Sequence, residues 1–237
     1  MWIIASRKSR LAMWQAEHVQ TLMQKNTHTS NVKVLGLSTK GDEILDRSLS
    51  KIGGKGLFVK ELELAMLKGK AHLAVHSLKD VPMELPAKFL LAAILRREDP
   101  RDAFIGKQTK NLSSLPIGAK VGTSSLRREF QLKVFRPDLK IVPLRGNLDT
   151  RLKKLDEGDF DGIVLAAAGL KRLGLESRIC QLISKDIFLP SAGQGAIAIE
   201  ILKKSTLDEN DILRHLNHDK TFSEVMLERR VAAELGA

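Results

Sequence analysis

Short apolar runs and helical patterns alternate along the chain. In its first part, apolar side chains recur at helical spacing over residues 9–26 and 57–68, which predicts two helices. The apolar runs that predict strands in this part are 2–6, 32–38, 71–76 and 88–95. This alternation is typical of an α/β fold with a largely parallel or mixed sheet.

A charged segment that contains a proline, RREDPRD at 96–102, interrupts the pattern, and a second α/β series follows it. Ser124 or Ser125 is the expected N-cap of a helix that runs to Phe135. The other elements predicted in this series are strands at 120–123, 139–144 and 161–166 and a helix at 147–157.

A second break, LPSAGQG at 189–195, precedes one more predicted strand at 196–201. The tail from Asp208 is predicted to be helical, with Thr221 and Glu224 at capping-box spacing. Two α/β series joined by two crossing segments predict two lobes with a cleft between them. The late strand is expected to return to the first lobe.

Ligands of open α/β sheets bind at the carboxyl ends of the strands. The candidate binding loops are therefore those that follow residues 38, 76, 123, 144 and 166. One of them, HSLKDVP at 76–82, places His76, Ser77, Lys79 and Asp80 directly after an apolar strand. A carboxylate in this setting stabilises a developing cation or carries a proton. The alternative is a turn in which Asp80 pairs with Lys79.

The positive charge is concentrated in one part of the chain. The 237 residues carry a formal net charge of +11, and residues 120–155 hold ten Lys or Arg against three acidic residues, which is +7. This focus predicts an anionic partner, either nucleic acid or a polyanionic small molecule. Aromatic residues are only 4 % and Tyr is absent, so no stacking platform for bases is expected. A solvated basic face is the remaining alternative.

Several of these cations follow predicted strands. Arg127 and Arg128 come after VGTSSL, while Arg145 and Arg151 follow the next strand. Their planar guanidinium groups suit carboxylates, which they bind through two parallel hydrogen bonds. The glycine-rich stretch 51–61 adds lysines near a helix start, where it is either an anion-binding loop or a flexible loop.

Cysteine and histidine usage excludes several classes of protein. The single cysteine, Cys180, excludes an internal disulfide framework and a cysteine-cluster zinc site, and it fits a reducing compartment. The six histidines form no HxxxH or HExxH set, so no metal site is expected.

No apolar run approaches the ~18 residues of a membrane span, and the N-terminus lacks a secretory pattern. A soluble, cytoplasmic protein without a membrane partner is expected.

Longer motifs in a fixed order resemble a known family. GGKGLFVKELE, AVHSLKDVP, REDPRDAFI, VGTSSLRR, LRGNLDTRL, DGIVLAAAGLKRLG and LPSAGQGAIAIE closely resemble the porphobilinogen deaminase, or hydroxymethylbilane synthase, family. The resemblance runs from ASRKSRLAMWQAE to about Arg229. It implies a monomeric, cytoplasmic transferase of tetrapyrrole (heme) biosynthesis. Such an enzyme condenses four porphobilinogen molecules into the linear hydroxymethylbilane with release of ammonia, on a dipyrromethane cofactor.

The resemblance also implies roles for individual residues. Asp80 corresponds to the catalytic aspartate that stabilises the pyrrole nitrogen cations, and Lys79 lies beside it. The positions implied to bind the cofactor are Lys55, Lys79, Asp80, Thr123, Ser124, Ser125, Arg127, Arg128, Arg145 and Gly146. The positions implied to bind substrate are Arg7, Ser9, Lys51, Arg145, Arg151, Arg172 and Gln194.

The family's first two domains are similar to the lobes of type II periplasmic binding proteins. The resemblance implies a first domain at 1–95 and 196–217, a second at 101–190, and the start of a third at 218–237. In the family, a cysteine of the third domain carries the cofactor. Cys180 does not match it, so the attachment cysteine is expected to be absent from this chain, and an inactive chain is one expectation.

Two other functions stay open on the sequence. A non-catalytic, two-lobe module that binds anions shares the expected architecture. A nucleic-acid-binding protein shares the charge, although the family resemblance implies porphobilinogen and linear polypyrroles as partners, without nucleic acid.

Overall fold

The computed structural model describes residues 1–26, 31–43, 54–204 and 213–236. The chain forms two compact units. Unit 1 comprises Met1–Glu98 and Ala196–Ala237, and unit 2 comprises Asp99–Gly195. The assignment of residues 218–237 to a third domain stays a prediction.

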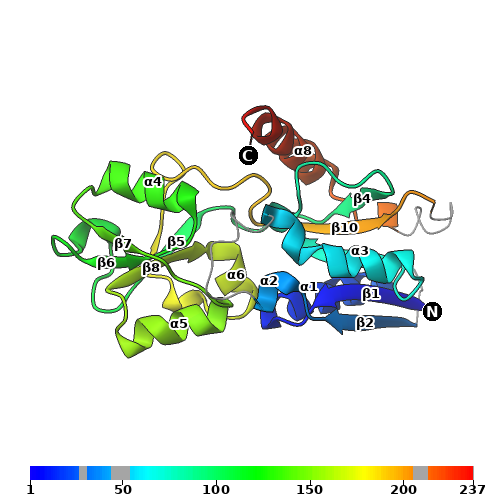
Figure 1. Ribbon diagram of the computed structural model, residues 1–237, viewed down its shortest axis with the longest axis horizontal. Coiled ribbons are helices and arrows are strands. Elements are labelled where there is room, and N and C mark those ends of the chain that lie inside the picture. The colour runs from blue at the N-terminus through cyan, green and yellow to red at the C-terminus, as the bar shows by residue number, and fades with distance from the viewer. Residues whose placement is uncertain (27–30, 44–53, 205–212, 237) are drawn as a thin grey trace. The chain divides into compact units, whose positions relative to one another are not determined.

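Unit 1 is built on a five-stranded mixed sheet (Figure 1). The strand order is β2 (Val32–Leu37), β1 (Trp2–Arg7), β3 (Leu73–Ser77), β10 (Ile197–Leu202) and β4 (Phe89–Ile94). β1 is parallel to β2 and β3, whereas β10 is antiparallel to β3 and β4. The late strand therefore returns to the first sheet, as the sequence predicts.

Helices cover both faces of this sheet. Apolar side chains of α1 (Arg10–Asn26) pack with Val75 on one face, and those of α3 (Lys60–Leu67) pack with Ala74 on the other. Val75 and Ala74 are neighbours in β3, so their side chains point to opposite faces. The shorter helices of this unit are α2 (Lys40–Glu43), η2 (Gly54–Phe58) and η3 (Leu78–Asp80).

The last helix of unit 1, α8 (Asp219–Glu234), contacts β4 and contributes Val225 to a buried cluster with Leu78 and Val81. The capping box predicted at Thr221 and Glu224 is wrong. The helix begins two residues before Thr221, and His218 is its N-cap, with Nδ1 accepting a hydrogen bond from the Thr221 backbone N–H at 3.2 Å. Residues 208–212 of the predicted helical tail lie outside the described residues.

Unit 2 has a second five-stranded mixed sheet. Its order is β7 (Lys140–Val142), β6 (Lys120–Gly122), β8 (Gly162–Ala166), β5 (Asp102–Gly106) and β9 (Gln181–Leu182). β6 is parallel to β7 and β8, while β5 is antiparallel to β8 and β9. The carboxyl ends of β6, β7 and β8 therefore lie along one edge of the sheet.

Two long helices cover the opposite faces of this sheet, as Figure 1 shows. Leu132 of α4 (Leu126–Phe135) packs into one buried cluster, and Leu152 of α5 (Leu148–Glu157) packs into the other. α6 (Ala167–Arg172) follows β8 directly and lies in the cluster of α5. The shorter 3-10 turns are η4 (Leu112–Ser114) and η5 (Glu176–Arg178).

The sequence pattern misses three elements of unit 2. β5 falls inside and just after the charged break, and α6 continues an alanine-rich run that resembles the end of a strand. β9 has only two residues, too few for a periodic pattern. The sequence pattern instead predicts a helix around Cys180, which is wrong: Cys180 lies between the η5 turn and β9. Among the described residues, no helix combines the length and the apolar character that crossing a membrane requires.

Candidate functional site

A pocket opens at the carboxyl ends of the parallel strands β1 and β3 in unit 1. The residues that line it come from β1 and the turn after it, α1, the η2 region, β3 and η3: Arg7, Ser9, Leu11, Ala12, Gln15, Phe58, Val59, Val75, His76, Ser77 and Asp80. Arg7, Ser9 and Asp80 are all predicted site residues. The structure thus brings Asp80 together with Arg7 and Ser9, which lie more than 70 residues before it in the sequence. Lys79 is half-buried in the same turn of η3 but does not line this pocket.

Side-chain contacts within this pocket hold its polar groups in place. Gln15 Nε2 donates a hydrogen bond to Ser77 Oγ at 2.9 Å. The Arg7 guanidinium lies over the Phe58 ring, 4.2 Å from its centroid, where a cation is attracted by the ring face. The sequence pattern does not single out Gln15 or Phe58, because each lies within a segment, 9–26 or 57–68, that it predicts only as a helix.

A buried acidic cluster lies behind the pocket. His76 Nε2 is 2.8 Å from Oε2 of Glu200, a β10 residue that is fully buried. Burial raises the pKa of Glu63 on α3, and the charge of Glu200 raises it further. Within the part of the chain that the structure describes, Glu63 Oε1 and Glu200 Oε1 have no hydrogen-bond partner. The imidazole of His76, which lines the pocket, is therefore in contact with a buried carboxylate, that of Glu200.

Unit 2 holds its own cluster of charges around the fully buried Asp102, the first residue of β5. Asp102 Oδ1 accepts hydrogen bonds from Arg128 Nε at 3.1 Å, Arg128 Nη2 at 2.8 Å and Gln194 Nε2 at 3.0 Å. Its Oδ2 forms an ion pair with Arg127 Nη1 at 2.8 Å. Burial alone raises the pKa of Asp102, but Arg128 and Arg127 outweigh burial and hold that pKa below its ordinary value.

The two arginines of this cluster differ in exposure. Arg128 is buried, and its Nη1 also donates to the Val164 carbonyl at 3.0 Å. The Arg127 side chain is 25 % exposed, and its Nη1 donates to the Leu189 carbonyl at 2.6 Å. One buried carboxylate faces two guanidinium groups, so one positive charge remains in excess. This excess, together with the exposure of Arg127, suits an anionic ligand.

The hydroxyl groups before α4 are engaged within the turn. Ser125 is the N-cap of α4, with its Oγ accepting from the Arg128 backbone N–H at 3.4 Å. Thr123 Oγ1 accepts from the Ser125 N–H at 3.2 Å, and Ser124 Oγ donates to the Leu144 carbonyl at 3.0 Å. The last bond joins the loops that follow β6 and β7. Of the two N-caps that the sequence leaves open, the structure uses Ser125.

The loop after β7 continues this edge of the sheet. Arg145 is half-buried, and Gly146 has a φ of 110°, a conformation that favours glycine. Arg151 Nε donates to the Gly146 carbonyl at 2.8 Å. On α6, which follows β8, Arg172 Nη2 donates to the Gly195 carbonyl at 2.6 Å. Arginines thus follow each of the three parallel strands of unit 2.

Two further predicted site residues, Lys51 and Lys55, come from the glycine-rich stretch 51–61. Lys51 lies outside the described residues. Lys55 is in η2, and the structure describes its backbone. Among the described residues, no group of three His, Cys, Asp or Glu side chains is arranged to hold a metal ion. The ligand roles of all these residues stay predictions from the sequence.

Comparison with known proteins gives consistent matches. Residues 2–209 match the family model described as porphobilinogen deaminase, dipyromethane cofactor binding domain. The porphobilinogen deaminase of Ralstonia nicotianae is 59 % identical over 237 residues, which cover 99 % of this chain and 70 % of the relative. That of Paraburkholderia phytofirmans is 59 % identical over 234 residues, 99 % of this chain and 68 % of the relative.

Solved structures match the fold at low sequence identity. A periplasmic substrate-binding protein of an ABC transporter from Coxiella burnetii has a TM-score of 0.57 at 14 % identity, covering 96 % of this chain and 97 % of its own. A nutrient-binding protein from Burkholderia cenocepacia bound to methionine has a TM-score of 0.55 at 17 % identity, covering 90 % of each chain. The chain therefore has the two-lobe α/β fold of the periplasmic binding proteins, as the sequence predicts.

Proposed function

This chain belongs to the porphobilinogen deaminase family, and we propose that the Asp80 pocket of unit 1 is the centre of its chemistry. The family's enzymes are transferases of tetrapyrrole and heme biosynthesis. They condense four porphobilinogen molecules into hydroxymethylbilane and release ammonia. One observation carries the assignment to the pocket: Asp80 and the cation Arg7 line a single pocket at the ends of β1 and β3.

The chemistry requires a carboxylate at the reacting ring. When porphobilinogen loses ammonia, its C–N bond breaks, the electron pair leaves with nitrogen, and the remaining methylene-pyrrole is a cation. The α-carbon of a second pyrrole then forms the new C–C bond and loses a proton. Asp80 is half-buried, so its carboxylate is able to accept a hydrogen bond from the pyrrole N–H and stabilise this charge.

Arg7 and Ser9 serve substrate binding in this proposal. Each porphobilinogen ring carries an acetate and a propionate group, and a guanidinium is a suitable donor to either. The stacking of Arg7 on Phe58 orients its planar group in the pocket. Gln15 adds an amide and Ser77 adds a hydroxyl, and the hydrogen bond between them fixes their positions.

The cationic cluster of unit 2 fits the dipyrromethane cofactor of the family. The charge balance around Asp102 supports this fit, because two guanidinium groups face one carboxylate and leave a positive charge for an anionic group. Arg127, Arg128 and Arg145 would hold its acetate and propionate groups, whereas Arg151, Arg172 and Gln194 would contact the substrate. When bound, dipyrromethane supplies the pyrrole carbon to which the first porphobilinogen is joined.

Cys180 has surroundings that suit a packed side chain. Its Sγ accepts a hydrogen bond from the Gly106 backbone N–H at 3.4 Å and packs against the Phe104 cluster of unit 2. This supports the expectation that Cys180 does not carry the cofactor.

Cellular location and assembly are also part of the proposal. We propose a cytoplasmic monomer that binds no nucleic acid. The composition, with one cysteine and 4 % aromatic residues, supports it. Size-exclusion chromatography with light scattering tests the monomer, and salt-sensitive retention on a DNA column would contradict the absence of nucleic-acid binding.

The test of the Asp80 role is Asp80→Asn in the complete enzyme loaded with its cofactor. The amide keeps the shape and removes the charge, so ammonia release is expected to fall by about 100-fold or more. Glu84→Gln is the matched control, because Glu84 is exposed four residues further along the same segment. Near-normal turnover of Asp80→Asn, with the control also normal, would refute the assigned role.

A further inference from the structure

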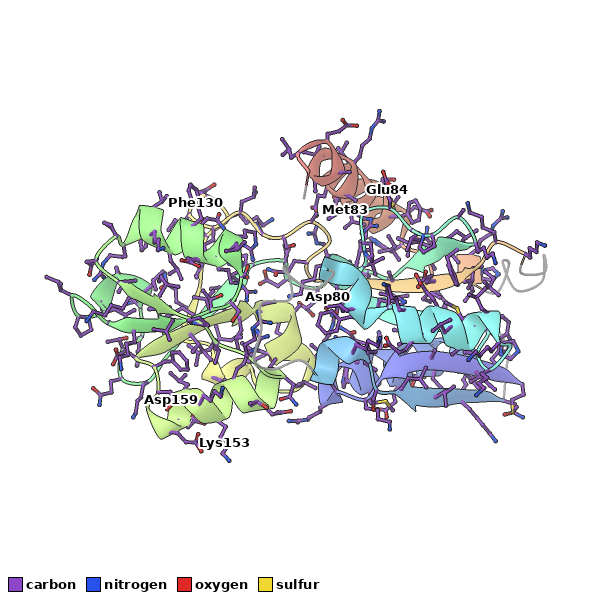
Figure 2. All side chains as sticks on the ribbon, viewed as in Figure 1. Asp80, Met83, Glu84, Phe130, Lys153 and Asp159 are labelled. Atoms are coloured by element: carbon purple, nitrogen blue, oxygen red, sulfur yellow. The ribbon has the colours of Figure 1, made fainter. Side chains whose placement is uncertain are left out.

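Arg229 is an arginine in the core of unit 1. Arg229 lies in α8, and only 4 % of its surface is exposed to solvent. Its guanidinium contacts the segment that follows Asp80. Nη1 donates to the Val81 carbonyl at 3.2 Å, and Nη2 donates to the carbonyls of Pro82 at 2.5 Å and Met83 at 3.0 Å. Figure 2 labels Met83, whose carbonyl takes part in this contact, and Asp80, which precedes it in the same segment. Three successive carbonyl groups are thus bound by one side chain.

The charge of Arg229 is unusual for its surroundings. Burial lowers its pKa from the ordinary value of an arginine. Among the described residues, no ion pair includes Arg229, and the contacts of its guanidinium there are with the backbone carbonyls of Val81, Pro82 and Met83. A buried cation without a counter-ion is costly, and three charge-assisted hydrogen bonds offset part of that cost. A hydrophobic side chain would fill this position more cheaply if packing were its only role.

The segment that Arg229 binds is continuous with Asp80. The Leu78 N–H donates to the Ala196 carbonyl at 3.0 Å, and the Val81 N–H donates to the Leu78 carbonyl at 3.1 Å. Leu78 and Val81 are both fully buried. The backbone is therefore held on both sides of Asp80: before it by Ala196, the residue that precedes β10, and after it by Arg229. Asp80 is the residue between these anchors that lines the pocket.

We propose that Arg229 is a positioning residue, whose guanidinium fixes the backbone of residues 81–83 and thereby aims the Asp80 carboxylate into the pocket. The inference rests on the proposed function of Asp80. It gives α8 a role beyond packing, because the position of this helix sets that of the segment. Lysine cannot replace Arg229 in this role, since an ammonium group is a point charge without the planar fork that spans successive carbonyls.

The experiment compares Arg229→Lys and Arg229→Met with the same substitutions at Arg230. Arg230 is exposed on the next position of α8, so its variants change charge and helix propensity without touching the segment. In the complete enzyme, kcat for ammonia release is expected to fall about tenfold or more in Arg229→Lys, with KM within about twofold, because small displacements of a reacting group are costly. Both Arg230 variants are expected to stay within about twofold of the parent.

Two further measurements separate positioning from stability. Amide hydrogen exchange on this chain is expected to speed up at residues 78–83 in Arg229→Lys, while thermal unfolding shows how far the whole fold is weakened. In the Asp80→Asn background, Arg229→Lys is expected to cause little additional loss of kcat, because it acts through Asp80. If Arg229→Met does not fold, the Lys variant still decides the question.

The outcomes that overturn the proposal are distinct from those that overturn the role of Asp80. Unchanged exchange at 78–83 in Arg229→Lys would show that the guanidinium does not hold the segment. Faster exchange with an unchanged kcat would show that the segment does not position Asp80. An additive loss in the double variant would show that Arg229 does not act through Asp80. Near-normal turnover of Asp80→Asn alone refutes the proposed function, whatever the exchange data show.

Discussion

Replacement of Asp102 by asparagine is expected to destabilise unit 2 strongly. The substitution keeps the size of the side chain and removes the negative charge that faces Arg127 and Arg128. Asp102 is fully buried, with both oxygens within 2.8 Å of a guanidinium nitrogen. Asp102→Asn therefore leaves one buried arginine and one partly buried arginine side by side without a counter-charge.

The size of the effect follows from this geometry. Removal of one partner from a buried ion pair costs about 3–5 kcal/mol. For a chain of this length, each kcal/mol lowers the melting temperature by roughly 2–4 °C, so a decrease of about 6–20 °C is expected. Displacement of Arg127 is expected to weaken the binding of carboxylate ligands as well.

The pH dependence of this effect has a defined sign. Because Arg128 and Arg127 hold the pKa of Asp102 below its ordinary value despite burial, the folded state favours the ionised carboxylate. The stabilisation is complete above the pKa of the unfolded chain, about 3.9, and is lost as the pH falls through the folded-state pKa. The difference in free energy of unfolding between the parent and Asp102→Asn should therefore become smaller below about pH 4.

Urea unfolding followed by far-UV circular dichroism, from pH 7 down to acid, measures both effects. Glu129→Gln is the control, since it breaks the exposed ion pair with Lys133, which is worth about 0.5 kcal/mol at most. A loss below about 1 kcal/mol for Asp102→Asn at pH 7 would refute the reasoning. If the difference in free energy of unfolding between the parent and Asp102→Asn stayed constant down to acid pH, the assignment of a negative charge to folded Asp102 would be refuted.

Two further predictions concern Glu63 and Gly146. Burial and Glu200 raise the pKa of Glu63, so the free energy of unfolding of the parent should fall as the pH rises through that folded-state pKa. Glu63→Gln removes the titrating group and should abolish this fall. Urea unfolding should therefore show that the free energy of unfolding of Glu63→Gln, relative to that of the parent, increases from about pH 4 to about pH 8. Gly146→Ala forces an L side chain into a φ of 110° and places Cβ 2.7 Å from Thr150 Cγ2; a loss of about 1–3 kcal/mol is expected, and an unfolding curve that matches the parent would contradict it.

Much of the fold follows from local patterns in the sequence. Strands such as β1, β3 and β10 are apolar runs between polar segments, and α1 and α5 have periodic apolar positions. The sequence pattern fails where a residue is stabilised by contacts with a distant part of the chain rather than by its neighbours in sequence. β5 begins within a charged break because its first residue, Asp102, is paired with arginines from another element. The sequence does not indicate the N-cap of α8, because His218 occupies a position at which serine, threonine, aspartate or asparagine is usual.

The site shows the same division. Asp80 and Arg127 are recognisable because they follow predicted strands and lie in long motifs. The side-chain contacts around the Asp80 pocket are not recognisable from the sequence, because the partners are distant along the chain. Arg229 and Val81 are 148 residues apart, and His76 and Glu200 are 124 apart. Arg229 and Glu200 look like ordinary charged positions on a helix and a strand until the fold brings their partners to them.

The most direct test of the proposed function is the amount of ammonia released for each porphobilinogen bound. Calorimetric titration gives binding, and an enzymatic assay of the same solution of the complete enzyme gives ammonia. The account predicts one ammonia for each porphobilinogen consumed and four for each hydroxymethylbilane formed, with release lost in Asp80→Asn. Saturable binding of porphobilinogen without release of ammonia would contradict the account and indicate a two-lobe module that binds anions without catalysis.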